Sequence, residues 1–357
     1  MLWALGVCLL SNRIGRGLGL LDWPDPEGGR KLHTQVTPLV GGLAVLPPVL
    51  AVALWVRGGL DGSPFVSSHL AWLAFAVGAL LLTGMADDRL GLGPRLRLLF
   101  SLTVFSAVAL YAPDFRVSFL LFEGWPLILM PGLWGIVFSI VCLAGLLNAV
   151  NMADGKNGIV ISMSLVWALV LWANAPRFLD PVFAAFAAGL LVALEFNLSG
   201  KLFLGDGGSY GLSALCGLLA IYVYNHGFAR FDAGQLALLF AVPVYDTLRL
   251  IVSRRLRGHS PFRADRDHLH HHIAYRFGWP LGLVVYMSLV IVPSAIALWQ
   301  PRLAPVLLVL GVPVYAAVLV LTVRRGDFEP EIVPRLANAL RAPLGSARRP
   351  SSRHGGA

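Results

Sequence analysis

Apolar segments about 20 residues long recur along almost the whole chain, separated by short polar connections. Crossing the roughly 30 Å hydrocarbon core of a bilayer takes about 20 helical residues. We therefore predict ten membrane-spanning helices, at residues 38–56, 68–86, 96–112, 127–147, 158–175, 179–197, 208–225, 235–252, 279–299 and 303–323. The opening stretch MLWALGVCLL is apolar but too short to span comfortably, which leaves open an eleventh helix whose true start lies upstream.

The composition agrees with this pattern, because 57% of the residues are hydrophobic and only 13% are charged. These values lie outside the range of soluble globular domains. The predicted fold class is an all-α polytopic membrane protein with 10–11 transmembrane helices and an active-site cleft at the cytoplasmic face. The closely spaced helices leave no room for a soluble domain. We expect one membrane domain over residues 1–324 and a basic, disordered cytoplasmic tail over 325–357.

The positive charges are distributed on one side of the predicted membrane. Of the 28 Lys and Arg residues, the even-numbered connections hold only Arg57, Arg116, Arg177, Arg230 and Arg302. The positive-inside rule therefore assigns the other set of connections to the cytoplasm. The net charge of +9 therefore reflects the orientation of the chain in the membrane. No pattern of interleaved basic and aromatic residues indicates a nucleic-acid partner.

Polar motifs gather in the same cytoplasmic connections. They are DPEGGRKLH (25–33), MADDRLGLGPRLR (85–97), NAVNMADGKNGI (148–159), FNLSGKLFLGDGGS (196–209) and FRADRDHLHHHIAYRFG (262–278). The connections on the opposite side contain no comparable clusters of Asp, Asn, Lys, His and Gly. This one-sided distribution predicts a single functional site at the cytoplasmic interface.

Four carboxylates stand out in these motifs, namely Asp87, Asp88, Asp154 and Asp206. Ionised groups at a membrane boundary are costly unless they are paired or coordinated. A single helix-end Asp is usually a cap, but four on one side favour a site for a hard cation such as Mg²⁺. The glycine-rich segments GDGGS and DGKNG precede apolar helices and could bind an anion through backbone N–H groups.

Cations and histidines complete the polar set. Lys31, Lys201, Arg249, Arg263 and Arg266 can pair with phosphates, although topology alone also explains basic residues on this side. If residues 267–275 form a helix, His268, His271 and His272 share a face, a spacing that could hold zinc. No Cys or Glu nearby supplies further ligands, and the neighbouring arginines would repel a metal. We therefore favour a surface that binds a phosphorylated sugar nucleotide.

In this order, the five motifs resemble those of the polyprenyl-phosphate N-acetylhexosamine-1-phosphate transferase family. The segment GHSPFRADRDHLHH is similar to the branch that transfers GlcNAc-1-phosphate or a related sugar. The resemblance implies a Mg²⁺-dependent enzyme, with Mn²⁺ as an alternative ion. It would transfer the sugar phosphate from a UDP-N-acetylhexosamine to undecaprenyl phosphate and release UMP, with its active site facing the cytoplasm. The location implied is the bacterial inner membrane, at the start of a cell-envelope polysaccharide such as O-antigen, and a homodimer is left open.

The resemblance also assigns roles to residues. Asp87 and Asp88 match the pair that handles the lipid phosphate, Asp206 and Asn151 the metal position, and Asp154 the centre of the nucleotide site. Phe203 matches an aromatic that stacks on uracil, and Lys201 a cation of the same motif. His268, His270 and His271 match the loop of sugar-phosphate recognition. The other substrate-binding residues implied are Lys31, Asn148, Gly155, Asn157, Asn197, Arg263 and Arg266. Asn157 stands where the family often has a second Asp.

Two alternatives remain. One is the phospho-MurNAc-pentapeptide transferase of peptidoglycan synthesis, a relative within the same enzyme class. The other is a secondary transporter, whose charges would lie near the bilayer midplane on broken helices in repeated halves. The charges of this chain collect at one interface instead, and we detect no internal repeat.

Overall fold

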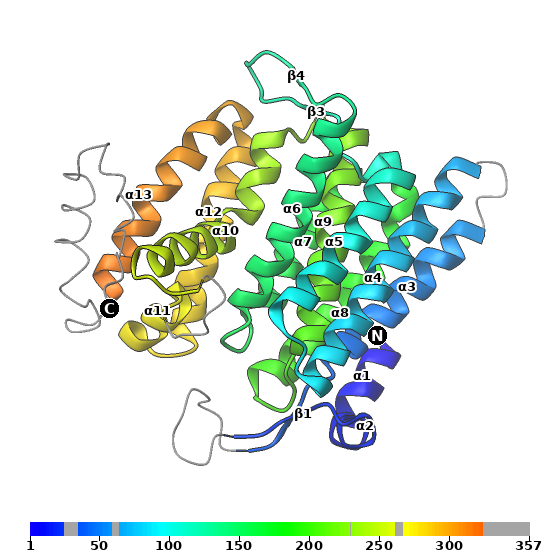
Figure 1. Cartoon of the computed structure of the whole chain (residues 1–357), viewed down its shortest axis with the longest axis vertical. Helices are drawn as coiled ribbons and strands as arrows, with labels where there is room; N and C mark the ends of the chain where they lie inside the picture. The colour runs from blue at the N-terminus through cyan, green and yellow to red at the C-terminus, as the bar shows by residue number, and fades with distance from the viewer. Residues whose placement is uncertain (25–34, 59–63, 229, 261–266, 324–357) are drawn as a thin grey trace, which may run out of the picture.

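Long helices run roughly side by side along one axis of the molecule (Figure 1). The computed structural model describes residues 1–24, 35–58, 64–228, 230–260 and 267–323. Its α-helices are α1 (Leu2–Leu9), α2 (Ser11–Leu18), α3 (Gly41–Gly58), α4 (Pro64–Leu90), α5 (Pro94–Tyr111), α6 (Leu133–Ala153), α7 (Ile159–Asn174), α8 (Asp180–Leu198), α9 (Gly205–Gly227), α10 (Ala233–Leu256), α11 (Leu269–Phe277), α12 (Leu281–Trp299) and α13 (Ala304–Thr322). The tail predicted for 325–357 lies outside the described residues.

All ten predicted spanning segments form helices. Within the described residues, eight helices are long and apolar enough to cross a membrane. The other two, α3 and α7, contain shorter apolar helical stretches at Gly41–Val56 and Ile159–Asn174. Helix α1 has eight residues, too few to span a bilayer. The chain is thus an all-α, multi-pass membrane protein, as its hydropathy pattern predicts.

Helix α6 begins later than the sequence indicates. We predicted a helix over 127–147, but residues before Pro131 form a small antiparallel hairpin of β3 (Phe119–Leu120) and β4 (Ile128–Leu129). Gly132, with φ of +55°, sits between this hairpin and the helix. The helix also ends later than predicted, at Ala153 and not at residue 147. Its last turns carry Asn148 and Asn151.

Helix α9 is the central helix of the bundle, and every residue of its apolar window is buried. Glycines let neighbouring backbones approach its first turns closely. A Cβ atom on Gly84 of α4 would lie 2.3 Å from the carbonyl oxygen of Asp206, and one on Gly42 of α3 would lie 2.6 Å from Cα of Gly208. This tight packing brings the end of α4 against the beginning of α9.

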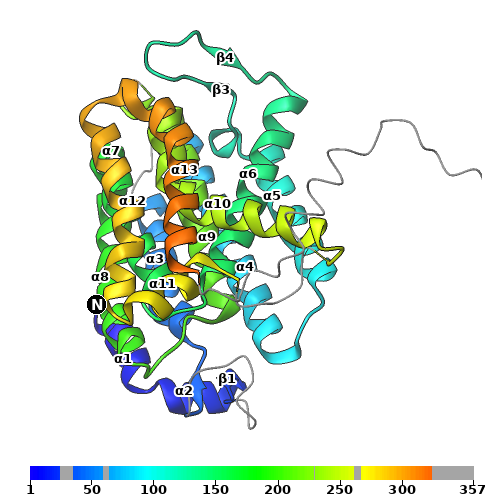
Figure 2. The same cartoon turned by 90° about the vertical axis from the view of Figure 1, so that its left-hand side faces the viewer.

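A second hairpin fixes the segment that leads into α9. Strands β1 (Leu21–Asp22) and β2 (Thr37–Pro38) pair antiparallel. The N–H of Phe203 donates to the carbonyl of Pro38 at 2.9 Å, and the N–H of Gly41 donates to the carbonyl of Phe203 at 3.0 Å. This hairpin lies at the opposite end of the molecule from β3 and β4 (Figure 2).

Candidate active site

Asp88 caps the first turn of α9 from the last turn of α4. Its two carboxylate oxygens accept hydrogen bonds from the N–H groups of Asp206, at 2.9 Å, and Gly207, at 3.0 Å. The first N–H groups of a helix lack partners within the helix and carry partial positive charge, so a carboxylate there is stabilising. Gly205 has φ of +73°, and a Cβ atom at this residue would lie 2.7 Å from Asp88 Oδ2. The GDGG motif is therefore shaped to receive Asp88.

Asp87 is held by side chains instead. It is buried, and its Oδ2 accepts from Nη1 of Arg97 at 2.7 Å and from the hydroxyl of Tyr210 at 3.4 Å. The same Arg97 nitrogen lies 3.6 Å from Oδ2 of Asp206. Arg97 thus stands between two of the predicted carboxylates. Sequence reasoning did not single it out, although it ends the quoted motif at 85–97.

Asn151 and Asp154 complete the group from the end of α6. Nδ2 of Asn151 donates to Oδ1 of Asp206 at 2.6 Å and to Oγ of Ser209 at 3.0 Å. Asp154 is the residue after the helix. Burial raises the pKa of Asp154 to about 7, and the nearby charge of Asp206 adds to this effect. Three segments far apart in the sequence therefore meet at one site.

This cluster fits a divalent cation. Asp87, Asp88, Asp154 and Asp206 lie together, and the guanidinium of Arg97 contacts Asp87 and Asp206. Several like charges in a partly buried site are unfavourable unless positive charge neutralises them. The carboxylate oxygens are the type of ligand that Mg²⁺ prefers, whereas Asn151 presents its amide nitrogen to Asp206. Asp206 and its hydrogen-bonded neighbour Asn151 are the pair that the sequence analysis assigned to the metal.

The loop from Asp154 to Gly158 is fixed on several sides. The N–H of Gly158 donates to Oδ1 of Asn197 at 2.6 Å, and Nδ2 of Asn197 donates to the carbonyl of Leu202 at 2.9 Å. Nε1 of Trp279 donates to the carbonyl of Asn157 at 3.2 Å. Both ends of the buried Asn197 amide are therefore bound to backbone, and its predicted contact with substrate stays a prediction.

The remaining predicted substrate residues lie around this loop or outside the described chain. Asn148 is half-buried and donates to the carbonyl of Ala144 one turn back. Lys201 is exposed, and Phe203 is half-buried. Lys31, Arg263 and Arg266 lie outside the described residues. The substrate contacts of all these residues stay predictions.

The histidines occupy the start of α11. The helix expected over 267–275 begins at Leu269, and His268 is its N-cap with extended backbone angles. The N–H groups of His271 and His272 bond back to the carbonyl of His268, and the rings of His268 and His271 lie 6.2 Å apart. The ring of His268 stacks on that of His270 with centroids 5.3 Å apart, and the rings of His270 and His271 lie 4.3 Å apart.

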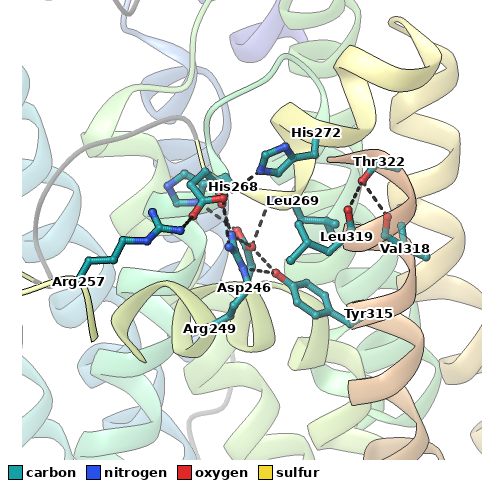
Figure 3. Close-up of polar contacts among 11 residues, drawn as sticks. Asp246, Arg249, Arg257, His268, Leu269, His272, Tyr315, Val318, Leu319 and Thr322 are labelled. Carbon is teal, nitrogen blue, oxygen red and sulfur yellow. Dashed lines mark hydrogen bonds and ion pairs between the residues drawn. The ribbon is translucent and has the colours of Figure 1, made fainter. Parts of the chain in front are cut away.

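Asp246 of α10 lies beside His268 (Figure 3). Its Oδ2 accepts from Nδ1 of His268 at 3.0 Å. Its Oδ1 accepts from the hydroxyl of Tyr315, from Nη2 of Arg249 and from the N–H of Leu269. Sequence reasoning missed Asp246 and Tyr315. The available signal was a carboxylate in the middle of the apolar segment 235–252, where an ionisable residue is expected to have a function.

Asp267 holds the last of the four histidines. Its Oδ1 lies 3.0 Å from Nε2 of His272 and 3.2 Å from Nη1 of Arg249, and its Oδ2 lies 3.5 Å from Nη2 of Arg257. Burial opposes ionisation, but the hydrogen bond from His272 and the two guanidinium groups outweigh it and lower the pKa of Asp267. His268 and His272 are thus anchored by carboxylates, and His270 lies between them.

Asp246, His268 and His270 each offer a ligand atom within 4.8 Å of the others. A metal ion does not fit this group well, because the oxygens of Asp246 already accept from four donors, one of them the guanidinium of Arg249. The zinc interpretation, which the sequence analysis disfavoured, therefore has little support here.

His270 joins the histidines to the carboxylate site. A Cβ atom on Gly155 would lie only 2.2 Å from Nε2 of His270, so the imidazole lies directly against the backbone of the 154–158 loop. Burial lowers the pKa of His270 well below its usual range, and His271 and His268 act in the same direction, so the ring is neutral. The motifs at 85–97, 148–159 and 196–209, and the described part of the histidine motif at 267–278, thus contribute to one continuous site.

The acidic motifs of α4, α6 and α9 lie in the part of the chain that resembles known proteins. Residues 70–224, which include all four carboxylates, match the model of glycosyl transferase family 4. The matched segment, 155 of the 357 residues, is similar to this family.

Individual relatives extend the similarity beyond the matched segment. The undecaprenyl-phosphate alpha-N-acetylglucosaminyl 1-phosphate transferase of Salmonella typhi is 28% identical over 277 residues, covering 73% of this chain and 71% of the relative. The protein of the same name from Escherichia coli (strain K12) is 27% identical over 279 residues, with the same coverage. A probable undecaprenyl-phosphate N-acetylglucosaminyl 1-phosphate transferase of Bacillus subtilis (strain 168) is 24% identical, covering 89% of each chain.

Proposed function

We propose that the chain transfers N-acetylhexosamine 1-phosphate, with GlcNAc as the favoured sugar, from a UDP-sugar to undecaprenyl phosphate. The products are undecaprenyl-diphosphate-sugar and UMP. The observation that carries this proposal is the meeting of Asp87, Asp88, Asn151, Asp154 and Asp206 at one end of the bundle. The names of the relatives support the substrate class.

The reaction joins two phosphates. An oxygen of the lipid phosphate forms a bond to the phosphorus that carries the sugar, and the bond from that phosphorus to the bridging oxygen of UMP breaks. Both substrates are anionic, so their approach requires positive charge in the site. Mg²⁺, held by Asp206 with Asn151 beside it, would supply most of that charge. Arg97 supplies more, because its guanidinium already lies between Asp87 and Asp206.

The two adjacent carboxylates have different surroundings, which suggests different tasks. Asp88 uses both oxygens to cap α9 and so holds Asp206 in place. Asp87 is paired with the side chains of Arg97 and Tyr210, which can move when a phosphate binds. We therefore assign contact with the lipid phosphate to Asp87, and the positioning of the metal-binding turn to Asp88.

The histidine turn is assigned to the donor. His270 lies against the 154–158 loop that contains Asp154 and Asn157. A neutral imidazole there can donate or accept one hydrogen bond to the sugar nucleotide without adding charge. Phe203 and Lys201, from the segment before α9, would bind the base and a phosphate.

The excess of Lys and Arg in the connections at this end favours an active site that faces the cytoplasm of a bacterial inner membrane. A water-soluble nucleotide sugar is available on that side. The lipid phosphate can reach the same end from the inner leaflet.

Purified protein in detergent, supplied with undecaprenyl phosphate and radiolabelled UDP-sugars, tests the function. We expect labelled lipid and equimolar UMP from UDP-GlcNAc or UDP-GalNAc, and none after chelation of divalent ions. Asp206→Asn serves as the inactive control. A labelled lipid formed only from UDP-MurNAc-pentapeptide would support the peptidoglycan enzyme instead, and exchange of unmodified substrate across vesicles would support a transporter.

A further inference from the structure

Nε2 of His270 is a buried polar atom without a hydrogen-bond partner among the described residues. The side chain is 1% exposed. Leaving such an atom unpaired costs about 1–3 kcal/mol, and folded proteins rarely tolerate it without a reason. The ring must therefore be held in place by contacts that do not involve Nε2.

Those contacts come from the neighbouring ring of His268. The two imidazoles stack with an interplanar angle of 19°. His268 is itself bound through Nδ1 to Oδ2 of Asp246, at 3.0 Å. An ionised carboxylate only accepts hydrogen bonds, so Nδ1 of His268 must carry a proton. Asp246 therefore sets both the orientation of this ring and the position of its proton.

Asp246 is rigidly held for this task. It is 5% exposed, and its Oδ1 accepts from α13 through Tyr315, from α10 through Arg249, and from α11 through the N–H of Leu269. The N–H of Leu269 belongs to the first residue of α11, where the helix itself provides no acceptor for the N–H groups. One carboxylate thus fixes the start of the helix and the first histidine of the turn (Figure 3).

We propose that Asp246 is a positioning residue of the transferase site. Acting through His268, on which His270 stacks, it holds Nε2 of His270 against the 154–158 loop, where the donor binds. This inference rests on the proposed function and adds to it a residue that lies outside the carboxylate cluster and outside the histidine motif.

The substitution Asp246→Asn keeps the size of the side chain and changes its hydrogen bonding to His268. The amide oxygen can still accept from Leu269 and Tyr315, but the amide nitrogen would face the N–H of His268. The imidazole must then move its proton to Nε2 or lose the contact. Tyr245→Phe is the matched control, because it removes a hydrogen bond of 2.7 Å between α10 and the carbonyl of Leu308 in α13, one residue away from Asp246.

A double-mutant cycle with His268→Ala tests whether Asp246 acts through this ring. A small misplacement of a catalytic group can cost about 10²-fold in rate. We expect roughly that loss in kcat for each single variant, no further loss in the double variant, and an unchanged KM for the lipid phosphate. Tyr245→Phe should retain kcat within about twofold. Losses that multiply in the double variant, or an Asp246→Asn enzyme with wild-type kcat, would overturn the proposal.

A spectroscopic measurement tests the contact between Asp246 and His268 without an activity assay. Ring ¹⁵N shifts report which histidine nitrogen carries a proton, and the signals of His268 are those lost in His268→Gln. We expect a protonated Nδ1 in the wild-type protein and an unprotonated Nδ1 in Asp246→Asn, and unchanged shifts would overturn the inference. If the wild-type protein transfers no sugar phosphate, the proposed function fails, whereas these shifts still decide the role of Asp246.

Discussion

Asp88 and Asp206 are joined through the backbone, since a carboxylate at the end of α4 accepts the N–H of the residue that begins the acidic turn of α9. Asp88 thus fixes the position of Asp206. The arrangement also separates Asp88 from Asp87, its neighbour in the sequence, whose partners are Arg97 and Tyr210. Adjacent carboxylates thus have separable contributions to stability and activity.

Asp88→Asn should lower the thermal midpoint more than Asp87→Asn. An asparagine at 88 has only one oxygen, so one of the two N–H groups of α9 would face the amide nitrogen. Loss of a helix cap costs about 0.5–2 kcal/mol. Both variants should lose most of their turnover. Thermal unfolding in detergent and UMP release measure the two effects, and equal midpoints for the two variants would contradict the division of roles.

Gly155→Ala should reduce turnover strongly, because its new methyl group would collide with the imidazole of His270. The ring would have to rotate away from the donor loop. Gly145→Ala is the matched control, since Gly145 of α6 has open space around it and alanine favours helices by about 1 kcal/mol. UMP release is compared for equal amounts of the two variants, after size-exclusion chromatography has shown that both are folded. Wild-type activity of Gly155→Ala would argue against a role for His270 at this loop.

Arg97→Gln should lower kcat by at least about tenfold, because a cation between Asp87 and Asp206 would be lost where two phosphates must meet. Arg97→Lys should recover part of the rate, since it keeps the charge but not the planar geometry. The exposed Arg95 lies two residues away, and Arg95→Gln should have little effect. If Arg95→Gln and Arg97→Gln behave alike, the effect is one of general surface charge.

The sequence predicted the helices and the carboxylates for the same reason, namely that both patterns are local. Hydropathy identified ten helices, but it placed both ends of α6 too early. Pro131 and Gly132 end the preceding hairpin, and the helix continues past residue 147 to Ala153. Contacts between distant segments were inaccessible. Tyr315 is 69 residues from its partner Asp246, and no local pattern connects them. Asn197 shows the opposite limit of local reasoning. Its motif predicted contact with substrate, whereas its side chain binds the backbone of two loops.

The pKa of Asp154, raised to about 7, predicts how stability depends on pH. The unfolded chain releases this proton at lower pH than the folded protein does, so the folded protein binds more protons between the two pKa values. Stability without divalent ions should therefore fall as the pH rises through that interval. Asp154→Asn should flatten the fall. Because Mg²⁺ favours the ionised carboxylates, its stabilising effect should be larger above pH ~7 than below it.

Thermal unfolding measured across this pH range, with chelator and with Mg²⁺, tests the prediction. Asp114→Asn is a suitable control, because Asp114 follows α5 at the other end of the bundle and pairs there with His69. Its substitution should leave the response to Mg²⁺ intact. A wild-type midpoint that rises with pH in chelator, or a Mg²⁺ effect that Asp154→Asn does not diminish, would show that Asp154 is ionised without the metal and does not contribute to its site.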